Sequence, residues 1–530
     1  MSVKGHKHNS SMPSATVPCC GRSEENAGRI NRREFVASLG ATAALSGAAM
    51  TIASHVRAAS PKQTAASDAL AGAALRVKPV LVYQIAQRRE FTSWRPYGGL
   101  HTRDDVDKEA ERIKVELKNL SSKSEFAMEI LPLSLVGNDA EATAAAGSDC
   151  DTLLVYASGG NQGWLETLAA SGKPNVMFVR HKSGPVYLWY EIAHWRFLRK
   201  SEDTIKEPNM DVWDIVVDDY DDVLWRLRAL HGLKNALGTK VIAIGGLKAY
   251  SKPGQERGPA HAQAVWKFDI KSVSNEEMEQ RLKRAGADES IVQEVQRQTN
   301  ALLSQKNLTL ATDRKFIVNT FMALRVFKDI MAETGATNLG VADCMGGLIR
   351  RLDTPPCLAL SILNDEGYTA FCHTDFTHTP AGVLLHRISG KPSFVSNSHF
   401  PHHGMITLAH CAAPRKMNGK EYEPTKILTH FESDYGAATK VEYTKGQTTT
   451  NLIPNLVCTK WFGFRGKIVD SPSYDMCRSQ MDVEIDGDWQ KLLTDMQGFH
   501  TITCYGDYLR EVGYALKKLG IEWQNISERT

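Results

Sequence analysis

The sequence has little excess of charge and few long apolar runs. Across 530 residues, 63 Lys and Arg face 60 Asp and Glu, which gives a formal net charge of +3. So balanced a chain offers no electrostatic reason to expect nucleic acid as a partner. Beyond residue 59, no segment approaches the roughly 20 consecutive apolar residues that a bilayer-spanning helix needs. We therefore expect a mature chain without a stable transmembrane segment, and a small molecule as its substrate.

Cysteine is sparse and shows no familiar pattern. The ten cysteines form no CxxC pair and no zinc-ribbon spacing, which excludes a small disulfide-built scaffold. Cys344, Cys357, Cys372 and Cys411 lie beside apolar runs, so we expect them to be core residues. An oxidising compartment would still leave room for one or two disulfides.

Nucleotide-binding fingerprints are also missing. Gly159-Gly160 and Gly245-Gly246 both follow predicted strands, but neither belongs to a GxGxxG or GxxxxGK[ST] pattern. We interpret both as tight strand-to-helix turns and predict no nucleotide cofactor.

The N-terminus carries the layout of an export peptide. In Asn31-Arg32-Arg33-Glu34-Phe35-Val36, two arginines precede a weakly apolar run over 37–53, and small residues follow at Ala58-Ala59-Ser60. This pattern predicts a twin-arginine signal over residues 1–59, use of the twin-arginine translocase, and a folded protein delivered to the periplasm or another extracytoplasmic place. The alternative is an N-terminal helix that stays as an anchor.

After a predicted flexible lead-in over 60–76, short apolar runs alternate with helical patterns. Strands are predicted at 79–85, 152–156, 175–179 and 240–244, and helices such as 105–120 and 221–237 separate them. Strands separated by helices are typical of parallel sheets with helices on both faces. The sequence therefore predicts an α/β protein with two doubly wound parallel-sheet domains, over 77–205 and 206–353.

The region 354–530 has a different pattern. Short β-like runs at 369–372, 393–396, 405–409 and 438–443 are followed by a closing helix at 507–519. We predict a C-terminal β-rich α+β domain.

Histidine is concentrated in this last region. Nine of the seventeen histidines lie there, and imidazole is both a common transition-metal ligand and a natural proton carrier near neutral pH. Three groups of residues lie at or near the ends of consecutive predicted strands: Cys372-His373-Thr374-Asp375, Asn397-Ser398-His399 and His402-His403. The nine are His373, His378, His386, His399, His402, His403, His410, His430 and His500.

Four segments carry a family resemblance: 369–375, 389–397, 406–411 and 498–507 with the helix after it. In order and spacing they resemble the C-terminal half of the L-fucose and L-arabinose isomerase superfamily. The motif match covers only about 338–522, whereas the three-domain layout of the family agrees with most of the chain. The resemblance implies an L-fucose isomerase-like fold, a homo-oligomer, and an aldose–ketose isomerase that uses a divalent ion such as Mn²⁺. His500 matches the position of a metal-ligating histidine.

The sequence departs from the family at two ligand positions. The family usually has a glutamate where His373 stands and a second carboxylate where Asn397 stands. In a first interpretation, the metal is held by His373, Asn397 and His500, and the catalytic groups are His373 and Asp375. This ligand set would favour Zn²⁺ or Co²⁺ over Mn²⁺. In a second, the register differs by a few residues and Asp375 itself, or Glu366, is the missing carboxylate. In a third, the isomerase chemistry is lost, and a sugar-binding or assembly protein, or an enzyme with a different sugar reaction, remains.

Sugar contacts are predicted in two places. The segment 87–99 follows the first predicted strand and mixes Arg88, Trp94 and Arg95, which suit the apolar face and the hydroxyls of a sugar. In the resembling family the N-terminal domain helps to complete the site of a neighbouring subunit. His410, within the segment 406–411, is the other predicted sugar-binding residue. The alternative for 87–99 is a packed surface loop.

Overall fold

The computed structural model describes residues 70, 72–95, 100–159, 161–187, 210–342 and 344–528. The predicted export signal and most of the predicted lead-in lie outside these residues. Within them, no helix is both long enough and apolar enough to cross a membrane.

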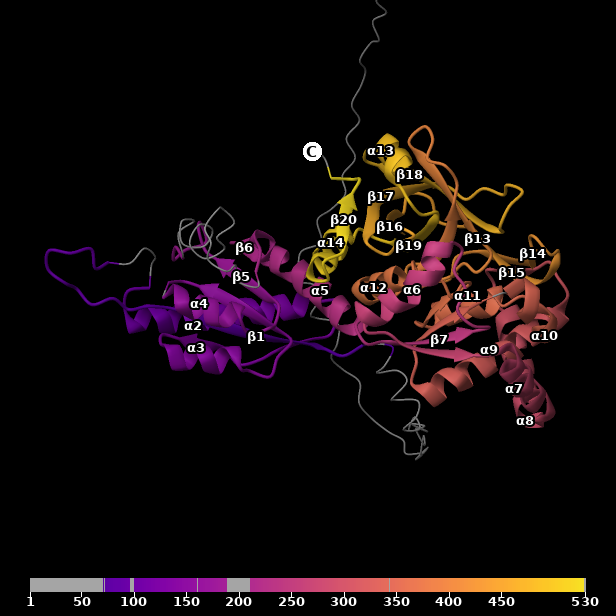
Figure 1. The fold of residues 1–530 in the computed structure, drawn as a ribbon, viewed down its shortest axis with the longest axis horizontal. Helices are drawn as coiled ribbons and strands as arrows, with labels where there is room; N and C mark the ends of the chain where they lie inside the picture. Colours follow the sequence, from indigo (N-terminus) through magenta and orange to yellow (C-terminus); the bar gives the residue numbers. More distant parts are fainter. Residues whose placement is uncertain are drawn as a thin grey trace, which may run out of the picture. The chain divides into compact units, whose positions relative to one another are not determined.

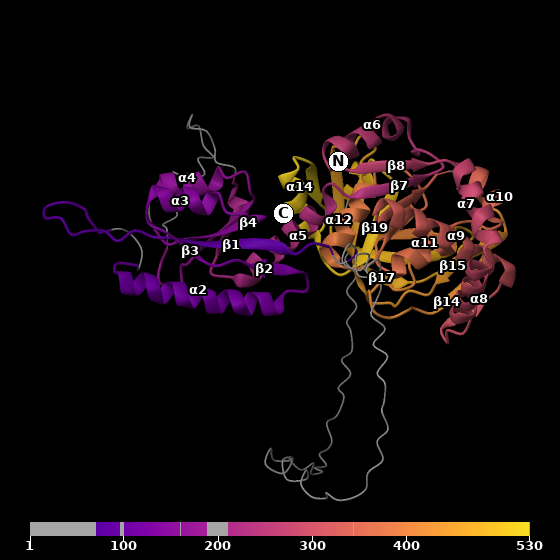
Figure 2. The ribbon, with the colours of Figure 1, turned by 90° about the horizontal axis from the view of Figure 1, so that it is seen from below.

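The first sheet is parallel in every pairing, with strand order β2-β1-β4-β5-β6 and β3 also paired with β1. Helices α3 (Asp139–Ala146) and α4 (Gln162–Ala169) cover one face, and α2 (Arg103–Lys123) lies on the other (Figure 2). The strands are β1 (Leu75–Val82), β2 (Met128–Ile130), β3 (Ser134–Val136), β4 (Thr152–Ala157), β5 (Asn175–Val179) and β6 (Ile215–Val217).

Local sequence explains why α2 forms where it does. Thr102 and Asp105 form a capping box that satisfies the first free N–H groups of the helix. Val106, Ile113 and Leu117 then recur at helical spacing and are buried against the sheet.

The second sheet is also parallel, with strand order β11-β10-β7-β8. Its strands are β7 (Lys240–Ile244), β8 (Asp269–Val273), β10 (Asn338–Val341) and β11 (Thr369–Phe371), and its helices are α6 (Lys252–Ala264), α7 (Asn275–Ala287), α8 (Glu289–Leu303), α9 (Arg314–Thr334), α10 (Ile349–Leu352) and α11 (Cys357–Asp365). The prediction that 369–372 belongs to the C-terminal β-rich domain is wrong, because β11 pairs with β10. The buried helix α11 supplies the crossover that a parallel pair requires.

The third sheet closes on itself. Its order is β16-β19-β12-β13-β18-β17-β20, and an additional pairing of β16 with β17 joins six of the strands in a ring. Figure 1 shows these orange and yellow strands gathered in one layer of the fold. The strands are β12 (Phe394–Ser398), β13 (Met405–His410), β16 (Thr448–Pro454), β17 (Lys460–Asp470), β18 (Ser479–Asp486), β19 (His500–Tyr505) and β20 (Glu522–Asn525).

Smaller elements complete the C-terminal region. A three-stranded sheet has the order β15-β14-β9, with β9 at Leu308–Leu310, β14 at Thr425–His430 and β15 at Tyr435–Val441. The helices are α12 (Thr379–Ser389), α13 (Trp489–Asp495) and α14 (Leu509–Lys518), and α12 packs against α5 (Tyr220–Ala236), β11 and β19. The prediction of an α/β chain with parallel sheets and a β-rich end is confirmed.

One apolar core connects the second sheet to the closed third sheet. Phe371 of β11 and Ile502 of β19 belong to it, and Trp266 stacks on Trp461 with ring centroids 5.5 Å apart. The carboxyl ends of the second sheet's strands are thereby held near the start of β19. This shared core sets the position of the site described next.

Candidate metal centre

The segment after β11 carries the first part of the site. Asp375 is 1% exposed, and its two carboxylate oxygens accept hydrogen bonds from the backbone N–H of Thr377 (2.9 Å) and of Tyr250 (3.2 Å). Thr374 accepts another from the backbone N–H of Lys248 at 2.9 Å. These bonds tie the loops after β7 and β11 together at the carboxyl edge of the second sheet, where open parallel sheets commonly bind ligands.

The closed sheet supplies the second part. His500 is the first residue of β19, and Asn397 of β12 is its direct partner in the antiparallel register. Phe499 packs against the ring of Tyr250 at a centroid distance of 4.8 Å. Strand pairing and ring packing thus hold His500 against the loop after β7.

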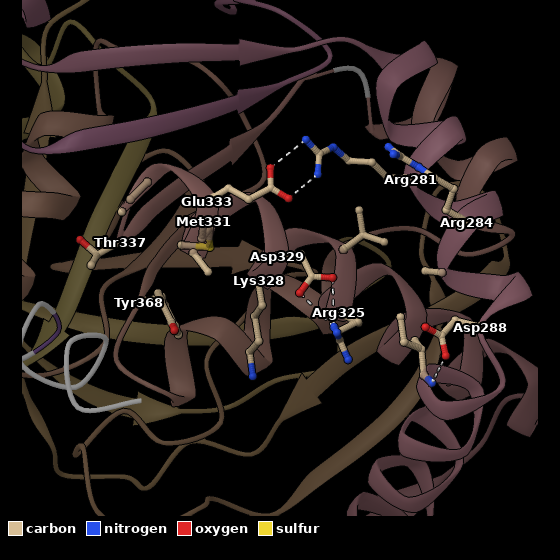
Figure 3. A pocket seen from close by; sticks show the side chains of 16 residues that line it. Arg281, Arg284, Asp288, Arg325, Lys328, Asp329, Met331, Glu333, Thr337 and Tyr368 are labelled. Carbon is tan, nitrogen blue, oxygen red and sulfur yellow. Dashed lines mark hydrogen bonds and ion pairs between the residues drawn. The ribbon is translucent and has the colours of Figure 1, made fainter. Parts of the chain in front are cut away.

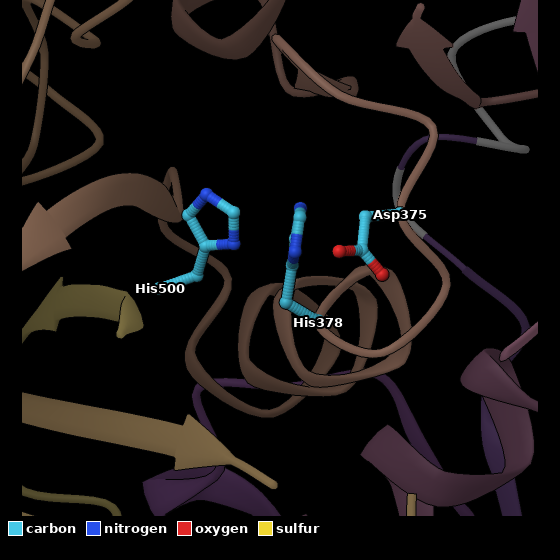
Figure 4. Close-up of side chains that lie close together, drawn as sticks. All are labelled: Asp375, His378 and His500. Atoms are coloured by element: carbon cyan, nitrogen blue, oxygen red, sulfur yellow. The ribbon is translucent and has the colours of Figure 1, made fainter. Parts of the chain in front are cut away.

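Asp375, His378 and His500 form a compact group. One ligand atom from each lies within 4.8 Å of the other two, and all three residues are buried. The ring of His378 stands between the other two side chains (Figure 4). Its centroid is 4.7 Å from that of His500.

Three of the four ring nitrogens of this group are buried without a hydrogen-bond partner. Both ring nitrogens of His378, and Nε2 of His500, are buried without one. Orphaned buried polar atoms are rare in folded proteins, and each calls for an explanation. Two imidazoles and one carboxylate are a common ligand set for Zn²⁺ and other divalent transition ions, so these residues fit a metal ion.

Three further polar side chains surround the group. The ring of His373 lies 5.1 Å from that of His500 and 5.8 Å from that of His410, and His373 is only partly buried. Nδ1 of His410 accepts the backbone N–H of Cys411 at 2.9 Å, which leaves the neutral ring's proton on Nε2. The side-chain oxygen of Asn397 is buried without a partner.

Burial keeps these rings uncharged. It is the first cause of the lowered pKa of His373, about 3, with neighbouring His410 and His378 adding to the effect and Asp375 opposing it. Burial likewise lowers the pKa of His378, His410 and His500. Neutral imidazole is the form that coordinates metal, so the site needs no proton loss from these rings near neutral pH.

The structure brings most of the predicted site residues together. Asp375 and His500 are in the metal group, and His373, His410 and Asn397 surround it. The sequence-based selection missed His378, which precedes α12 and follows Asp375 by three residues. An Asp-x-x-His spacing at the start of a helix is the signal that would have found it.

The predicted sugar-binding residues of the N-terminal region lie elsewhere. Arg88, Trp94 and Arg95 follow β1, on the side of the first sheet where its strands end. The guanidinium of Arg95 lies over the ring of Trp94 at 5.4 Å, and Phe91, three residues before Trp94, is fully exposed. Across the described residues we observe no hydrogen bond or ring contact from these side chains to the histidines.

A cavity of about 740 Å³ lies away from the histidines. Its lining includes Thr337, just before β10, and Tyr368, just before β11. The cavity therefore lies toward the amino ends of these two strands, whereas the candidate metal centre lies toward the carboxyl ends of the same sheet. Arg281 on its wall is already paired with Glu333 through two hydrogen bonds of 2.8 and 2.9 Å (Figure 3). Such paired charges do not favour this cavity as an anion site.

Comparison with known proteins adds no family to this description. No protein-family model matches the chain. No curated protein matches it at a significant level.

Proposed function

We propose that the protein is a metal-dependent enzyme of the aldose–ketose isomerase type that acts on a small sugar. The observation that carries the metal is the group of Asp375 with the unpaired, buried nitrogens of His378 and His500. The sugar and the reaction rest on the resemblance of the segments 369–375 and 498–507 to the L-fucose and L-arabinose isomerases.

Each residue of the site has a proposed part in the reaction. His378, His500 and Asp375 would hold the ion, and Asn397 would offer its unpaired oxygen beside His500. When bound, a divalent ion would hold neighbouring sugar oxygens and stabilise the charge that develops as a proton leaves carbon.

His373 is proposed as the proton carrier. It is the partly exposed residue of the cluster, and its neutral ring would accept a proton that leaves one sugar carbon. The protonated ring would then return that proton to the next carbon. Asp375 is less suited to that task in this arrangement, because both of its oxygens already accept backbone hydrogen bonds.

The ligand set also bears on which metal is bound. Two imidazoles with one carboxylate suit Zn²⁺ and Co²⁺ as well as the Mn²⁺ that the resemblance implies. The twin-arginine motif at Arg32-Arg33 supports export of the folded protein, so the ion would be loaded before transport. Arg88, Trp94 and Arg95 would then contact sugar bound to a neighbouring copy of the chain.

Metal analysis of the purified protein tests the proposal first. We expect about one ion per chain, and a higher melting temperature on adding Mn²⁺, Co²⁺ or Zn²⁺. His378→Ala and His500→Ala should each lose the ion, whereas the exposed control His181→Ala should keep it. Less than about a tenth of an ion per chain, with no metal-dependent gain in melting temperature, would remove the metal site.

The reaction needs its own assay. Ketose formation is measured from a panel of pentoses, hexoses and deoxysugars with the metal-loaded protein, and His373→Gln should lose most of the activity while keeping the ion. Sugar binding without any ketose formation would instead point to a binding protein on this scaffold.

A further inference from the structure

Five cysteines gather in the core beside the candidate metal centre. All eight cysteines of the described residues are free thiols, and these five contribute to a single apolar cluster. They come from separate segments of the chain, so the fold and not the local sequence brings them together. The five are Cys344, Cys357, Cys372, Cys411 and Cys477.

Two of these thiols end neighbouring strands. Cys344 begins the helical turn Cys344–Leu348 after β10, and Cys372 directly follows β11. Because β10 and β11 are adjacent and parallel, the two side chains meet at the same edge of the sheet. Their sulfurs are 3.8 Å apart, so a bond of about 2.05 Å requires a movement of only about 2 Å.

We propose that Cys344 and Cys372 form a disulfide when the protein meets a small disulfide oxidant. Cys344 is the partly exposed member and attacks first, forming a mixed disulfide and releasing one thiol of the oxidant. Cys372 then attacks the sulfur of Cys344 and releases the second thiol. The two cysteines lose two protons and two electrons in all, and the oxidant is reduced to two thiols.

The bridge would act on the segment that carries the site. Cys372 immediately precedes His373, so the bond would fasten the start of the segment bearing His373, Asp375 and His378 to the turn after β10. It would close a loop between residues 28 apart in the sequence. Such a cross-link restricts the unfolded chain, so the bridged form should melt at a temperature about 3 °C higher.

The reaction conditions follow from the thiols' surroundings. The hydrogen bond with Cys372 is the first cause, and burial the second, of a pKa of Cys344 raised above its ordinary value. Thiolate is the attacking form, so exchange should be slow at neutral pH and faster at alkaline pH.

Peptide mapping tests the bridge directly. The full chain is incubated with glutathione disulfide at alkaline pH, the remaining thiols are alkylated, and the digest is analysed by mass spectrometry. We expect a linked pair of peptides containing Cys344 and Cys372, two fewer alkylated thiols, and a rise in melting temperature that a dithiol reductant reverses.

Two variants make the result specific. Cys344→Ser should abolish the linked pair. Cys357→Ala removes the other thiol beside Cys372 and should leave the pair intact. A bridge from Cys372 to Cys357, a bridge confined to Cys411 and Cys477, or no bridge in the folded wild-type chain would each overturn the proposal.

Discussion

Replacing His378 with phenylalanine should make the metal-free protein more stable and abolish its response to metal. Both ring nitrogens of His378 are buried without a partner. A buried polar group left unsatisfied costs about 1–3 kcal/mol. The surroundings are already aromatic, with Phe371 at 6.2 Å and His500 at 4.7 Å between ring centroids, so a phenyl ring suits the space. We expect the free energy of unfolding to rise by about 1–3 kcal/mol.

The metal-loaded protein should respond in the opposite direction. At an ion concentration about 100 times the dissociation constant, a ligand that binds only the folded state adds about 2.7 kcal/mol to the free energy of unfolding. Wild type should show this gain. His378→Phe should show none, because it retains only one of the two histidine ligands.

Urea unfolding, followed by circular dichroism in chelator and in Zn²⁺, measures both effects. A shift in the midpoint at an unchanged m value reports the change in stability. His231→Phe, at a buried histidine of α5 outside the metal group, is the matched control and should keep the full metal response. A metal-dependent gain retained by His378→Phe would contradict this prediction. So would a loss of more than about 1 kcal/mol from the free energy of unfolding of the metal-free chain in both His378→Phe and the smaller His378→Leu.

Three further predictions concern other parts of the molecule. Burial lowers the pKa of His373 to about 3, so on acidification the unfolded state binds a proton at this residue before the folded state does. The free energy of unfolding measured in chelator should therefore fall as the pH drops from about 6.5 toward 3, and it should fall less steeply in His373→Gln. Arg415→Met should cost about 3–5 kcal/mol in urea unfolding, because it removes the guanidinium that lies 2.9 Å from the buried carboxylate of Asp365. Asp365→Asn combined with Arg415→Met should recover much of the loss, because the amide oxygen can still accept the backbone N–H groups of Arg415 and Lys416. Gly463→Ala should lower the melting temperature, because the new Cβ would overlap the indole of Trp523, and Trp523→Leu should reduce that penalty.

The parallel strands could be predicted closely because they are continuous apolar runs. Strands β5 and β7 have the predicted bounds, and four or more residues of each are fully buried. Strands covered on both faces show this pattern in the sequence itself.

The strands of the closed sheet were harder to predict. The long strand β17 contains Gly463 and Gly466, residues that weaken a strand prediction. In the fold, Trp523 packs over the first and Val483 over the second, so each glycine makes room for a side chain from a neighbouring strand. That reason depends on contacts that are remote in the sequence.

The same limit applies to the site. The strand-end pattern indicated His373, and the family resemblance indicated His500. His378 precedes a helix, and it meets His500 only because the shared core packs α12 against β19. A pattern in one segment cannot show that two side chains so far apart in the sequence will face each other.

The missing carboxylates of the family pattern are better understood with the structure. The resemblance puts acidic ligands at His373 and Asn397, yet the carboxylate that lies with two histidines is Asp375, two residues further along the same segment. This geometry favours the interpretation in which Asp375 takes the place of the missing acidic ligand, with His378 as a ligand that the family pattern did not suggest. His373, which is partly exposed and lies outside the group of three, keeps the part of proton carrier that we propose for it. A site altered in this way would keep one negative ligand and gain one imidazole, which shifts its preference from Mn²⁺ toward Zn²⁺ or Co²⁺ without removing the chemistry that a divalent ion supplies.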